Sequence, residues 1–256
     1  MNFKNEVVII TGGGSGIGEE AARQLVAAGA KVVINGRTQE KLAATAKSID
    51  PKGRNINIFA GDIGHVDTAS SLVNFTEKTF GNVDILINNA GVFVPKPFLE
   101  TTEVEYDQYQ DTILKGSYFM AQAAAKSMKE SGGGAIVNTG SMWGSQAIAA
   151  TPSSAYSAAK AGVHQLTKHL AIELAADNIR INTVAPAVVE TPVYSSFLTD
   201  EQIAEALPGF AAMHPLGRNG KPADLVNAIL FLASEKASWI TGVVLPVDGG
   251  IMAGRN

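Results

Sequence analysis

The chain has 256 residues, of which 46% are hydrophobic and 17% are charged. The charged fraction is below the usual value of about 25%, which excludes a disordered chain and points to surface buried in an oligomer. A formal net charge of −4 gives no basic excess for binding nucleic acid or an anionic membrane. The absence of cysteine excludes disulfides, thiolate metal sites and cysteine nucleophiles.

The apolar runs are too short for targeting or for spanning a membrane. The first of them, residues 7–10, is shorter than a signal peptide requires, and no run approaches the roughly 18 residues of a membrane span. We therefore expect a cytoplasmic protein that binds neither membranes nor nucleic acid. The length fits a single α/β domain over residues 1–256.

Seven short runs, rich in Val and Ile and without alternation, predict strands that are buried on both faces of a parallel sheet. In chain order they are residues 7–10, 31–34, 56–59, 83–87, 135–138, 179–184 and 243–247.

Longer amphipathic segments separate these runs. Helical spacing predicts helices over 17–28, 42–49, 106–128 and 155–175. Thr102/Glu105 and Thr199/Gln202 are capping-box pairs, the second of which opens a short helix at 203–207, and Pro222 suits the first turn of a last helix. The alternation predicts a doubly wound three-layer sandwich with a seven-stranded parallel sheet.

The stretch from Ala185 to Gly220 is the most irregular part of the chain. It contains four prolines and is too long for an ordinary connection. Loops of this length are often functional lids, so we expect a substrate lid at about residues 190–216.

A glycine-rich loop, Thr11-Gly12-Gly13-Gly14-Ser15-Gly16-Ile17-Gly18, joins the first predicted strand to the first predicted helix. Backbone N–H groups and the helix N-terminus can receive a phosphate there, and glycines let the backbone approach a ligand. The spacing is neither the strict G-x-G-x-x-G, because Glu19 occupies the last position, nor a P-loop. A flexible turn without a ligand is the alternative interpretation.

Tyr156 and Lys160 lie four residues apart on one face of a predicted helix. An ammonium beside a phenol favours the phenolate, and bringing a phenol to neutrality takes roughly 4 kcal/mol, which a partly desolvated charge can supply. Ser141 follows the strand at 135–138, at the edge of the sheet where ligands bind in open α/β folds. Taken one at a time, these residues also fit an ordinary surface pair and a serine in a turn.

Together these features resemble the short-chain dehydrogenase/reductase family over nearly the whole chain, from Val7 to Gly250. The matching motifs are the glycine motif at 12–18, Asp62, Asn88-Asn89-Ala90-Gly91, Ser141, Tyr156-x-x-x-Lys160, Arg180-x-Asn182 before Pro186, Thr191-Pro192, Pro215-Leu216-Gly217-Arg218 and the ending at 241–250. The resemblance implies a Rossmann-type fold, a nicotinamide dinucleotide and hydride transfer between a carbonyl and an alcohol.

The resemblance also implies a role for each site residue. Tyr156 is the general acid/base, Lys160 lowers its pKa and holds the nicotinamide ribose, and Ser141 stabilises the substrate oxygen on which charge grows. The implied cofactor-binding residues are Gly12, Ser15, Gly16, Ile17, Gly18, Arg37, Asp62, Ile63, Asn89, Ala90, Gly91, Tyr156, Lys160, Pro186, Val189 and Thr191. The implied substrate-binding residues are Ser141, Trp143, Tyr156 and Tyr194.

The second strand ends in Asn35-Gly36-Arg37, without the carboxylate that accepts the adenosine ribose hydroxyls of NAD. Arg37 can pair with a 2′-phosphate or stack on adenine. We therefore favour NADP(H), with NAD(H) as the alternative because Ser15 in the glycine loop is not basic.

Two positions depart from the family pattern. Ile113 precedes Leu114-Lys115-Gly116, where the family has an Asn thought to hold a water beside the lysine. We expect the apolar, β-branched Ile113 to leave this helix straighter and drier while activity persists. Ala187 replaces the usual glycine after Pro186, which narrows the nicotinamide side of the pocket or restricts its backbone.

The favoured function is an NAD(P)-dependent ketone reductase or alcohol dehydrogenase. The alternative is a catalytically weak or regulatory dinucleotide-binding protein on the same fold, for which Ile113 is the only support. Apolar residues of the lid, with Met142 and Trp143, either form a pocket for a hydrophobic ketone or pack the lid onto the body. The resemblance, the low charge and the small residues on helices 106–128 and 155–175 predict a homotetramer. The four histidines lack the spacing of metal ligands, so we expect no metal site.

Overall fold

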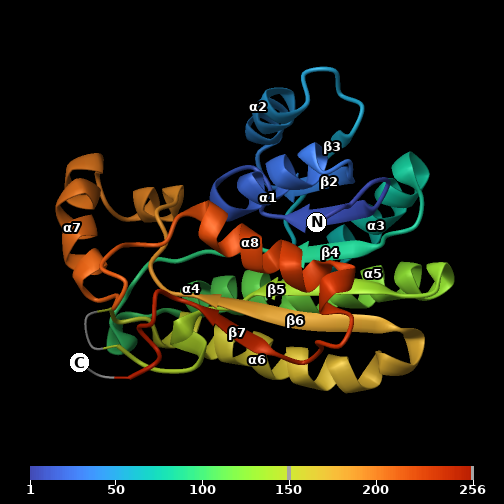
Figure 1. The fold of residues 1–256 in the computed structure, drawn as a ribbon. Helices are drawn as coiled ribbons and strands as arrows, with labels where there is room; N and C mark the ends of the chain where they lie inside the picture. The colour runs from blue at the N-terminus through green and yellow to red at the C-terminus, as the bar shows by residue number, and fades with distance from the viewer. Residues whose placement is uncertain (149–150, 255–256) are drawn as a thin grey trace.

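The centre of the protein is a seven-stranded parallel sheet (Figure 1), seen in a computed structural model that describes residues 1–148 and 151–254. The strands are β1 (Val7–Thr11), β2 (Lys31–Gly36), β3 (Ile56–Ala60), β4 (Ile85–Asn88), β5 (Gly134–Thr139), β6 (Ile179–Pro186) and β7 (Val244–Val247). Their order is β3-β2-β1-β4-β5-β6-β7, and every pair is parallel. The order reverses between β1 and β4, where ligands bind in sheets of this kind.

Helices cover both faces of the sheet. On one face, α1 (Gly16–Ala27), α2 (Gln39–Ile49) and α8 (Pro222–Ala233) enclose an apolar cluster with strand residues such as Val8 and Ile10. On the other face, α3 (Val66–Phe80), α5 (Gly116–Ser131) and α6 (Ser154–Glu173) enclose a second cluster that includes Ile9. Because successive strand residues point to opposite faces, both faces must be apolar, and the predicted three-layer sandwich is confirmed.

The segment predicted as one helix over 106–128 is interrupted. The capping box of Thr102 opens α4 (Glu103–Tyr109), a π-helical turn η2 (Gln110–Lys115) follows, and α5 continues from there. The prediction that Ile113 leaves a straighter helix is wrong, because Ile113 lies within this π-helical turn. The turn lets both Tyr109 and Ile113 pack in the cluster formed with α6, while α5 packs in the cluster with α3.

The predicted lid segment contains the short helix η5 (Pro192–Ser196) and the helix α7 (Asp200–Ala212), which is longer than the predicted one. The capping box of Thr199 and Gln202 opens α7 as predicted. This helix buries none of its side chains fully and stands apart from the body at the left of Figure 1. Four further short helices are η1 (Phe98–Glu100), η3 (Met142–Gly144), η4 (Ala175–Asp177) and η6 (Glu235–Ala237). Among residues 1–148 and 151–254, no helix has the length and apolar character needed to cross a membrane.

Candidate active site

Two adjoining cavities lie where the strands β1, β2, β4, β5 and β6 end. The smaller has a volume of about 190 Å³ and is lined mainly by the segments that follow β1, β2 and β3. The larger has a volume of about 670 Å³ and extends from the glycine loop to the lid. Gly12, Ser15 and Gly91 line both cavities. Apart from Gly18, every residue that the sequence assigned to cofactor or substrate lines one of them.

Gly12 and Gly18 allow the glycine loop to pack closely against its surroundings. Gly12 has a φ of +66°, and a Cβ on it would lie 2.9 Å from the Cα of Ala90. A Cβ on Gly18 would lie 2.3 Å from the carbonyl oxygen of Gly12. Gly18 therefore serves the packing of α1 onto the loop and does not line the cavities, and its contact with a cofactor stays a prediction.

Thr11 and Asn89 connect the glycine loop to the end of β4. The amide Nδ2 of Asn89 donates to the carbonyl oxygens of Thr11 and Gly12, each at 3.2 Å. The hydroxyl of Thr11 accepts from the backbone N–H groups of Asn89 and Ala90, each at 3.0 Å. Sequence analysis gave no role to the buried Thr11, although its place directly before the first glycine was a signal.

Ser141, Tyr156 and Lys160 line the larger cavity together. Tyr156 and Lys160 share a face of α6, and the Nζ of Lys160 lies 5.7 Å from the centre of the Tyr156 ring. The same Nζ donates to the carbonyl oxygen of Thr139 at 2.6 Å, at the end of β5. Ser141 caps η3, where its hydroxyl accepts from the N–H of Trp143 at 3.3 Å.

Burial shifts the pKa values of Tyr156 and Lys160. It raises the pKa of Tyr156 to about 12, while the Ser141 hydroxyl acts in the opposite direction and Tyr109 adds to the rise. Burial also lowers the pKa of Lys160 to about 8. Burial is the largest effect on the pKa of the phenol, and the role of Lys160 in lowering that pKa stays a prediction. Tyr156 carries its proton at neutral pH.

Phe93, which sequence analysis missed, lies among the aromatic rings of the larger cavity. Its ring centre is 4.9 Å from that of Tyr156, 5.7 Å from that of Phe197 and 6.1 Å from that of Trp143. Phe93 thus contacts the candidate catalytic tyrosine, the lid and the η3 turn. Its place two residues after the Asn-Asn-Ala-Gly run was the only sequence signal.

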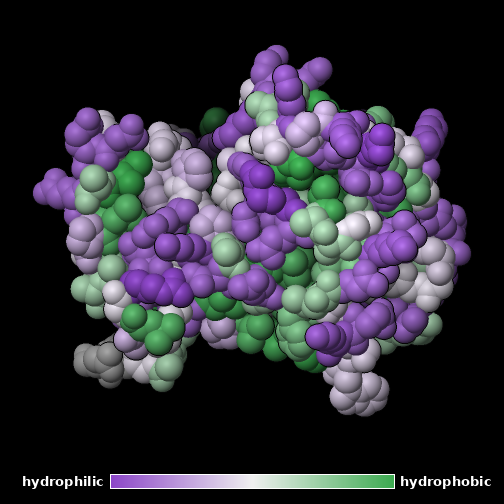
Figure 2. Space-filling view, turned by 45° about the horizontal axis from the view of Figure 1, so that its top comes forward, coloured by the Kyte–Doolittle hydropathy of each residue, from purple (hydrophilic) through white to green (hydrophobic). Residues whose placement is uncertain are grey.

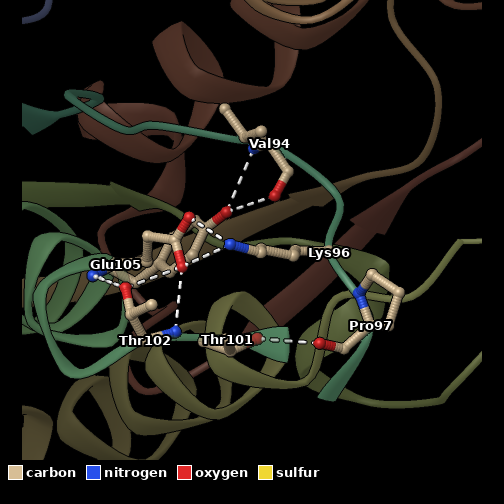
Figure 3. A network of polar contacts seen from close by, with 7 residues as sticks. Val94, Lys96, Pro97, Thr101, Thr102 and Glu105 are labelled. Carbon is tan, nitrogen blue, oxygen red and sulfur yellow. Dashed lines mark hydrogen bonds and ion pairs between the residues drawn. The ribbon is translucent and has the colours of Figure 1, made fainter. Parts of the chain in front are cut away.

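A network of polar contacts fixes the segment that carries Phe93 onto α4 (Figure 3). The hydroxyl of Tyr109 donates to the carbonyl oxygen of Val94 and accepts from its N–H. The Nζ of Lys96 lies 2.6 Å from Oε1 of Glu105, whose other oxygen accepts from the N–H of Thr102 at 2.9 Å. The hydrogen bond from Lys96 lowers the pKa of Glu105 to about 2, so the pair stays charged over the whole physiological range.

The smaller cavity has cationic residues beside the end of β2. Arg37 and Lys41 line it together with Thr38, and its one acidic lining residue, within the described chain, is Asp62. Asn35 is buried, and its amide Nδ2 donates to the carbonyl oxygens of Phe59 and Gly61, so this donor is already used within the protein. Sequence analysis missed Lys41, whose position depends on how α2 packs against the glycine loop. Over residues 1–148 and 151–254, no three potential ligand side chains gather as a metal site.

Comparison with known proteins agrees with this geometry. The family model described as enoyl-(acyl carrier protein) reductase matches residues 12–252. A 3α-hydroxysteroid dehydrogenase of Mediterraneibacter gnavus is 39% identical over 252 residues, covering 97% of this chain and 98% of its own. A short-chain type dehydrogenase/reductase from Mycobacterium marinum has a solved structure with a TM-score of 0.92 and 31% identity, covering 99% of this chain and 98% of its own. The chain is a short-chain dehydrogenase/reductase.

This short-chain dehydrogenase/reductase also resembles the crystal structure of levodione reductase, with a TM-score of 0.92 and 33% identity. The match covers 99% of this chain and 100% of that chain. It is an oxidoreductase that transfers a hydride between a nicotinamide dinucleotide and a carbonyl or alcohol. The comparisons give no support to the alternative of a weak or regulatory binding protein.

Proposed function

We propose that this enzyme interconverts bulky, neutral, apolar ketones and their secondary alcohols with NADP(H). Tyr156 acts as general acid/base, assisted by Ser141 and Lys160. The observation that carries the proposal is the larger cavity itself, in which these three residues face a pocket of aromatic and aliphatic side chains.

The residues around the two cavities fit a nicotinamide dinucleotide. Gly14 lines the smaller cavity together with Gly12 and Ser15 of the same loop. The N-terminus of α1, with Ser15, Gly16 and Ile17, would hold the pyrophosphate. The remaining positions would hold the adenine (Asp62, Ile63), the riboses (Asn89, Ala90, Gly91, Lys160) and the nicotinamide side (Pro186, Val189, Thr191). When bound, the nicotinamide supplies or accepts the hydride.

The protein side chains manage the charge that develops on the substrate oxygen. Because its pKa is raised to about 12, Tyr156 holds a proton at neutral pH and can donate it to that oxygen. Ser141, held at the N-terminus of η3, orients the same oxygen by donating a hydrogen bond. The ammonium of Lys160 stabilises the phenolate that Tyr156 leaves behind.

The preference for NADP(H) is supported by the charges at the smaller cavity. Arg37 and Lys41 provide two cations, and Thr38 stands at the N-cap of α2 without a side-chain capping bond. A 2′-phosphate is doubly charged near neutrality and accepts hydrogen bonds from such groups. NAD(H) lacks this phosphate and gains no charge pairing from Arg37 and Lys41.

The substrate class is supported by the composition of the larger cavity. Among the residues that line it, all within the described chain, the only charged side chains are Lys41 and Lys160. The bulkiest lining residues away from these lysines are Phe93, Trp143, Tyr194, Phe197, Phe210 and Met213. Such a surface gains from burying an apolar ring system and cannot pair with a substrate carboxylate or phosphate. The hydroxysteroid dehydrogenases among the relatives agree with this class.

The organisation that we propose is one catalytic domain over residues 1–256 with a substrate lid at 190–216. The lid contributes Tyr194, Phe197 and Phe210 to the cavity, yet α7 buries none of its side chains fully. The hydroxyl of Ser196 donates to the carbonyl oxygen of Phe93 at 3.1 Å, which connects the lid to the fixed side of the pocket. A helix without fully buried side chains suits a segment that opens and closes.

We further propose that the enzyme is a cytoplasmic homotetramer. Large apolar side chains are exposed on the monomer, with Trp239 99% and Ile172 79% accessible. Figure 2 shows hydrophobic side chains gathered between hydrophilic ones over one face of the molecule. Light scattering at micromolar concentration tests the assembly, and a monomeric mass would contradict it.

The experiment that tests the function follows NADPH absorbance with a panel of ketones. We expect turnover with bulky ring ketones and little with sugars or keto acids. Tyr156→Phe should lower turnover by about 10²–10⁴-fold while cofactor binding survives. Tyr118→Phe, on an exposed tyrosine, is the matched control and should leave turnover unchanged. If the Tyr156 variant keeps more than a tenth of the wild-type activity, Tyr156 is not the acid.

A further inference from the structure

His164 is buried inside the turn that carries Ser141. The backbone N–H of Ser141 donates to Nε2 of His164 at 3.3 Å, and the hydroxyl of Ser145 lies 3.4 Å from Nδ1. The imidazole is 6% exposed. Both ring nitrogens are therefore used by one short turn of the chain, which begins at the end of β5 and includes η3.

Two glycines let this turn close around the ring. A Cβ on Gly140 would lie 2.3 Å from Nε2 of His164, and a Cβ on Gly144 would lie 2.7 Å from its Cε1. Both distances are too short for any other residue type. The turn is thus shaped to the imidazole on both sides of Ser141.

The contacts define the protonation of the ring. A backbone N–H can only donate, so Nε2 must accept, and the ring proton is on Nδ1, where the Ser145 hydroxyl can receive it. Burial, with smaller contributions from the nearby Lys160 and Lys168, lowers the pKa of His164 to about 4. The residues packed on the ring from the turn are Gly140, Ser141, Gly144 and Ser145, none of which titrates near neutrality. The imidazole is therefore neutral at pH 7 with a fixed tautomer.

His164 is also placed to connect the three candidate catalytic residues. Tyr156, Lys160 and His164 follow one another at intervals of four residues on α6 and so lie along one face of the helix. Ser141 belongs to a different element, at the end of β5. The imidazole is the side chain through which α6 accepts a hydrogen bond from the backbone of Ser141 itself.

We propose that His164 is a positioning residue that holds the Ser141 turn against α6 and thereby sets the distance between the Ser141 hydroxyl and the Tyr156 phenol. Both groups must reach the same substrate oxygen, so an error in their separation weakens the stabilisation of the transition state. The inference rests on the proposed roles of Ser141 and Tyr156. It assigns His164 no contact with substrate or cofactor.

The test compares three variants by steady-state kinetics with a bulky ring ketone and NADPH. His164→Leu removes both polar contacts and keeps the volume, and we expect kcat to fall by about 10- to 100-fold, as for a small misplacement of reacting groups. The KM and the dissociation constant for NADPH should stay within about twofold of the wild-type values, because the misplacement affects the reacting groups and not the cofactor-binding residues. His164→Gln supplies an acceptor and a donor and should recover most of the lost kcat. His169→Leu makes the same chemical change at an exposed position of α6 and should match the wild type.

Melting curves and cofactor binding establish whether each variant is folded. If His164→Leu does not fold, Ser145→Ala, which removes only the partner of Nδ1, should lower kcat severalfold with unchanged NADPH binding. The proposal is overturned if a folded His164→Leu keeps wild-type kcat, or if kcat and cofactor affinity fall together. Equal losses in the Gln and Leu variants would also overturn it.

An NMR measurement separates this inference from the proposed function. In the wild type, the ¹⁵N shifts of the His164 imidazole should show a neutral ring with its proton on Nδ1 at pH 7. A wild type without activity on any ketone contradicts the proposed function and leaves this readout in place. A ring protonated on Nε2 contradicts the positioning role whatever the activity.

Discussion

The substitution Ile113→Asn restores the amide that the family pattern places beside the catalytic lysine, and it tests whether this enzyme needs it. Ile113 is 1% exposed and packs with Tyr109, Ala155, Ala159 and Val163. Tyr156 is partly buried and packs against the edge of the same cluster. The substitution therefore replaces an apolar contact of the π-helical turn with a buried amide.

The expected cost in stability is large. Exposing or removing a buried Ile side chain costs roughly 1.5–3 kcal/mol, and a buried amide without partners costs roughly 1–3 kcal/mol more. The free energy of unfolding should fall by about 2.5–6 kcal/mol in all, which for a domain of this size lowers Tm by roughly 5–24 °C. Ile113→Val is the control, and it should cost only about 0.5–1.5 kcal/mol.

The expected change in turnover is small by comparison. Lys160 already donates to the carbonyl oxygen of Thr139. In the proposed mechanism, Ser141 and Tyr156 stabilise the developing charge directly. A water relay acts on proton exchange more than on the hydride barrier, so kcat at a temperature where both proteins are folded should change by less than about tenfold. The assay is steady-state kinetics beside a melting curve for each variant. An unchanged Tm would refute the packing argument, and an inactive wild type rescued by Ile113→Asn would refute the mechanistic one.

Three further predictions follow from the charges of the site. Arg37→Ala and Lys41→Ala should each lower kcat/KM for NADPH by about 10- to 100-fold, since hydrogen bonds to charged groups contribute about 1.5–3 kcal/mol. The kcat/KM for NADH should change by less than about threefold in both variants. A higher kcat/KM with NADH than with NADPH in the wild type would contradict the NADP(H) preference. In the proposed mechanism, alcohol oxidation needs Tyr156 without its proton. Because burial raises the pKa of Tyr156 to about 12, the oxidation rate should rise with pH from 6 to 9, while the rate of ketone reduction varies little below pH 8. An oxidation rate that does not change with pH would exclude Tyr156 as the base. His164 has its pKa lowered from 6.5 to about 4, so the unfolded chain binds a proton between these pH values that the folded chain does not, and stability is lost as pH falls through this range. Denaturation at pH 7 and pH 4 should show that the wild type loses about 3 kcal/mol more than His164→Gln, whereas equal losses would show that His164 is not the titrating group.

The sheet and its edge were predictable because their signals are local. Strands buried on both faces must be apolar at consecutive positions, so each run marked a strand to within two residues at either end. The ends of parallel strands share one edge, so motifs placed directly after strands had to meet there. Ser141 and Asn89 lie at this edge for that reason.

The residues that sequence analysis missed act through contacts between distant segments. Phe93 matters because its ring lies beside those of Tyr156 and Phe197. His164 matters because the turn from Gly140 to Ser145, on a different element, closes on its ring. Apolar periodicity also does not distinguish a π-helical turn from α-helix at Ile113, which packs in the cluster formed with α6. The spacing of Tyr156 and Lys160 indicates proximity, but the depth of burial that sets their pKa values is a property of the whole fold.

That burial changes the order in which the two groups release protons. A free tyrosine loses its proton slightly before a free lysine, whereas here Lys160 has a pKa of about 8 and Tyr156 of about 12. A phenolate formed when Tyr156 protonates the substrate oxygen is thus a much stronger base than the amine of Lys160. Transfer of a proton from the Lys160 ammonium to the Tyr156 phenolate is therefore favourable. The Lys160 amine, with a pKa of about 8, then takes up a proton from solvent at neutral pH. In the proposed mechanism, Tyr156 can therefore regain its proton through Lys160 without an amide at position 113, and an apolar isoleucine there is compatible with activity.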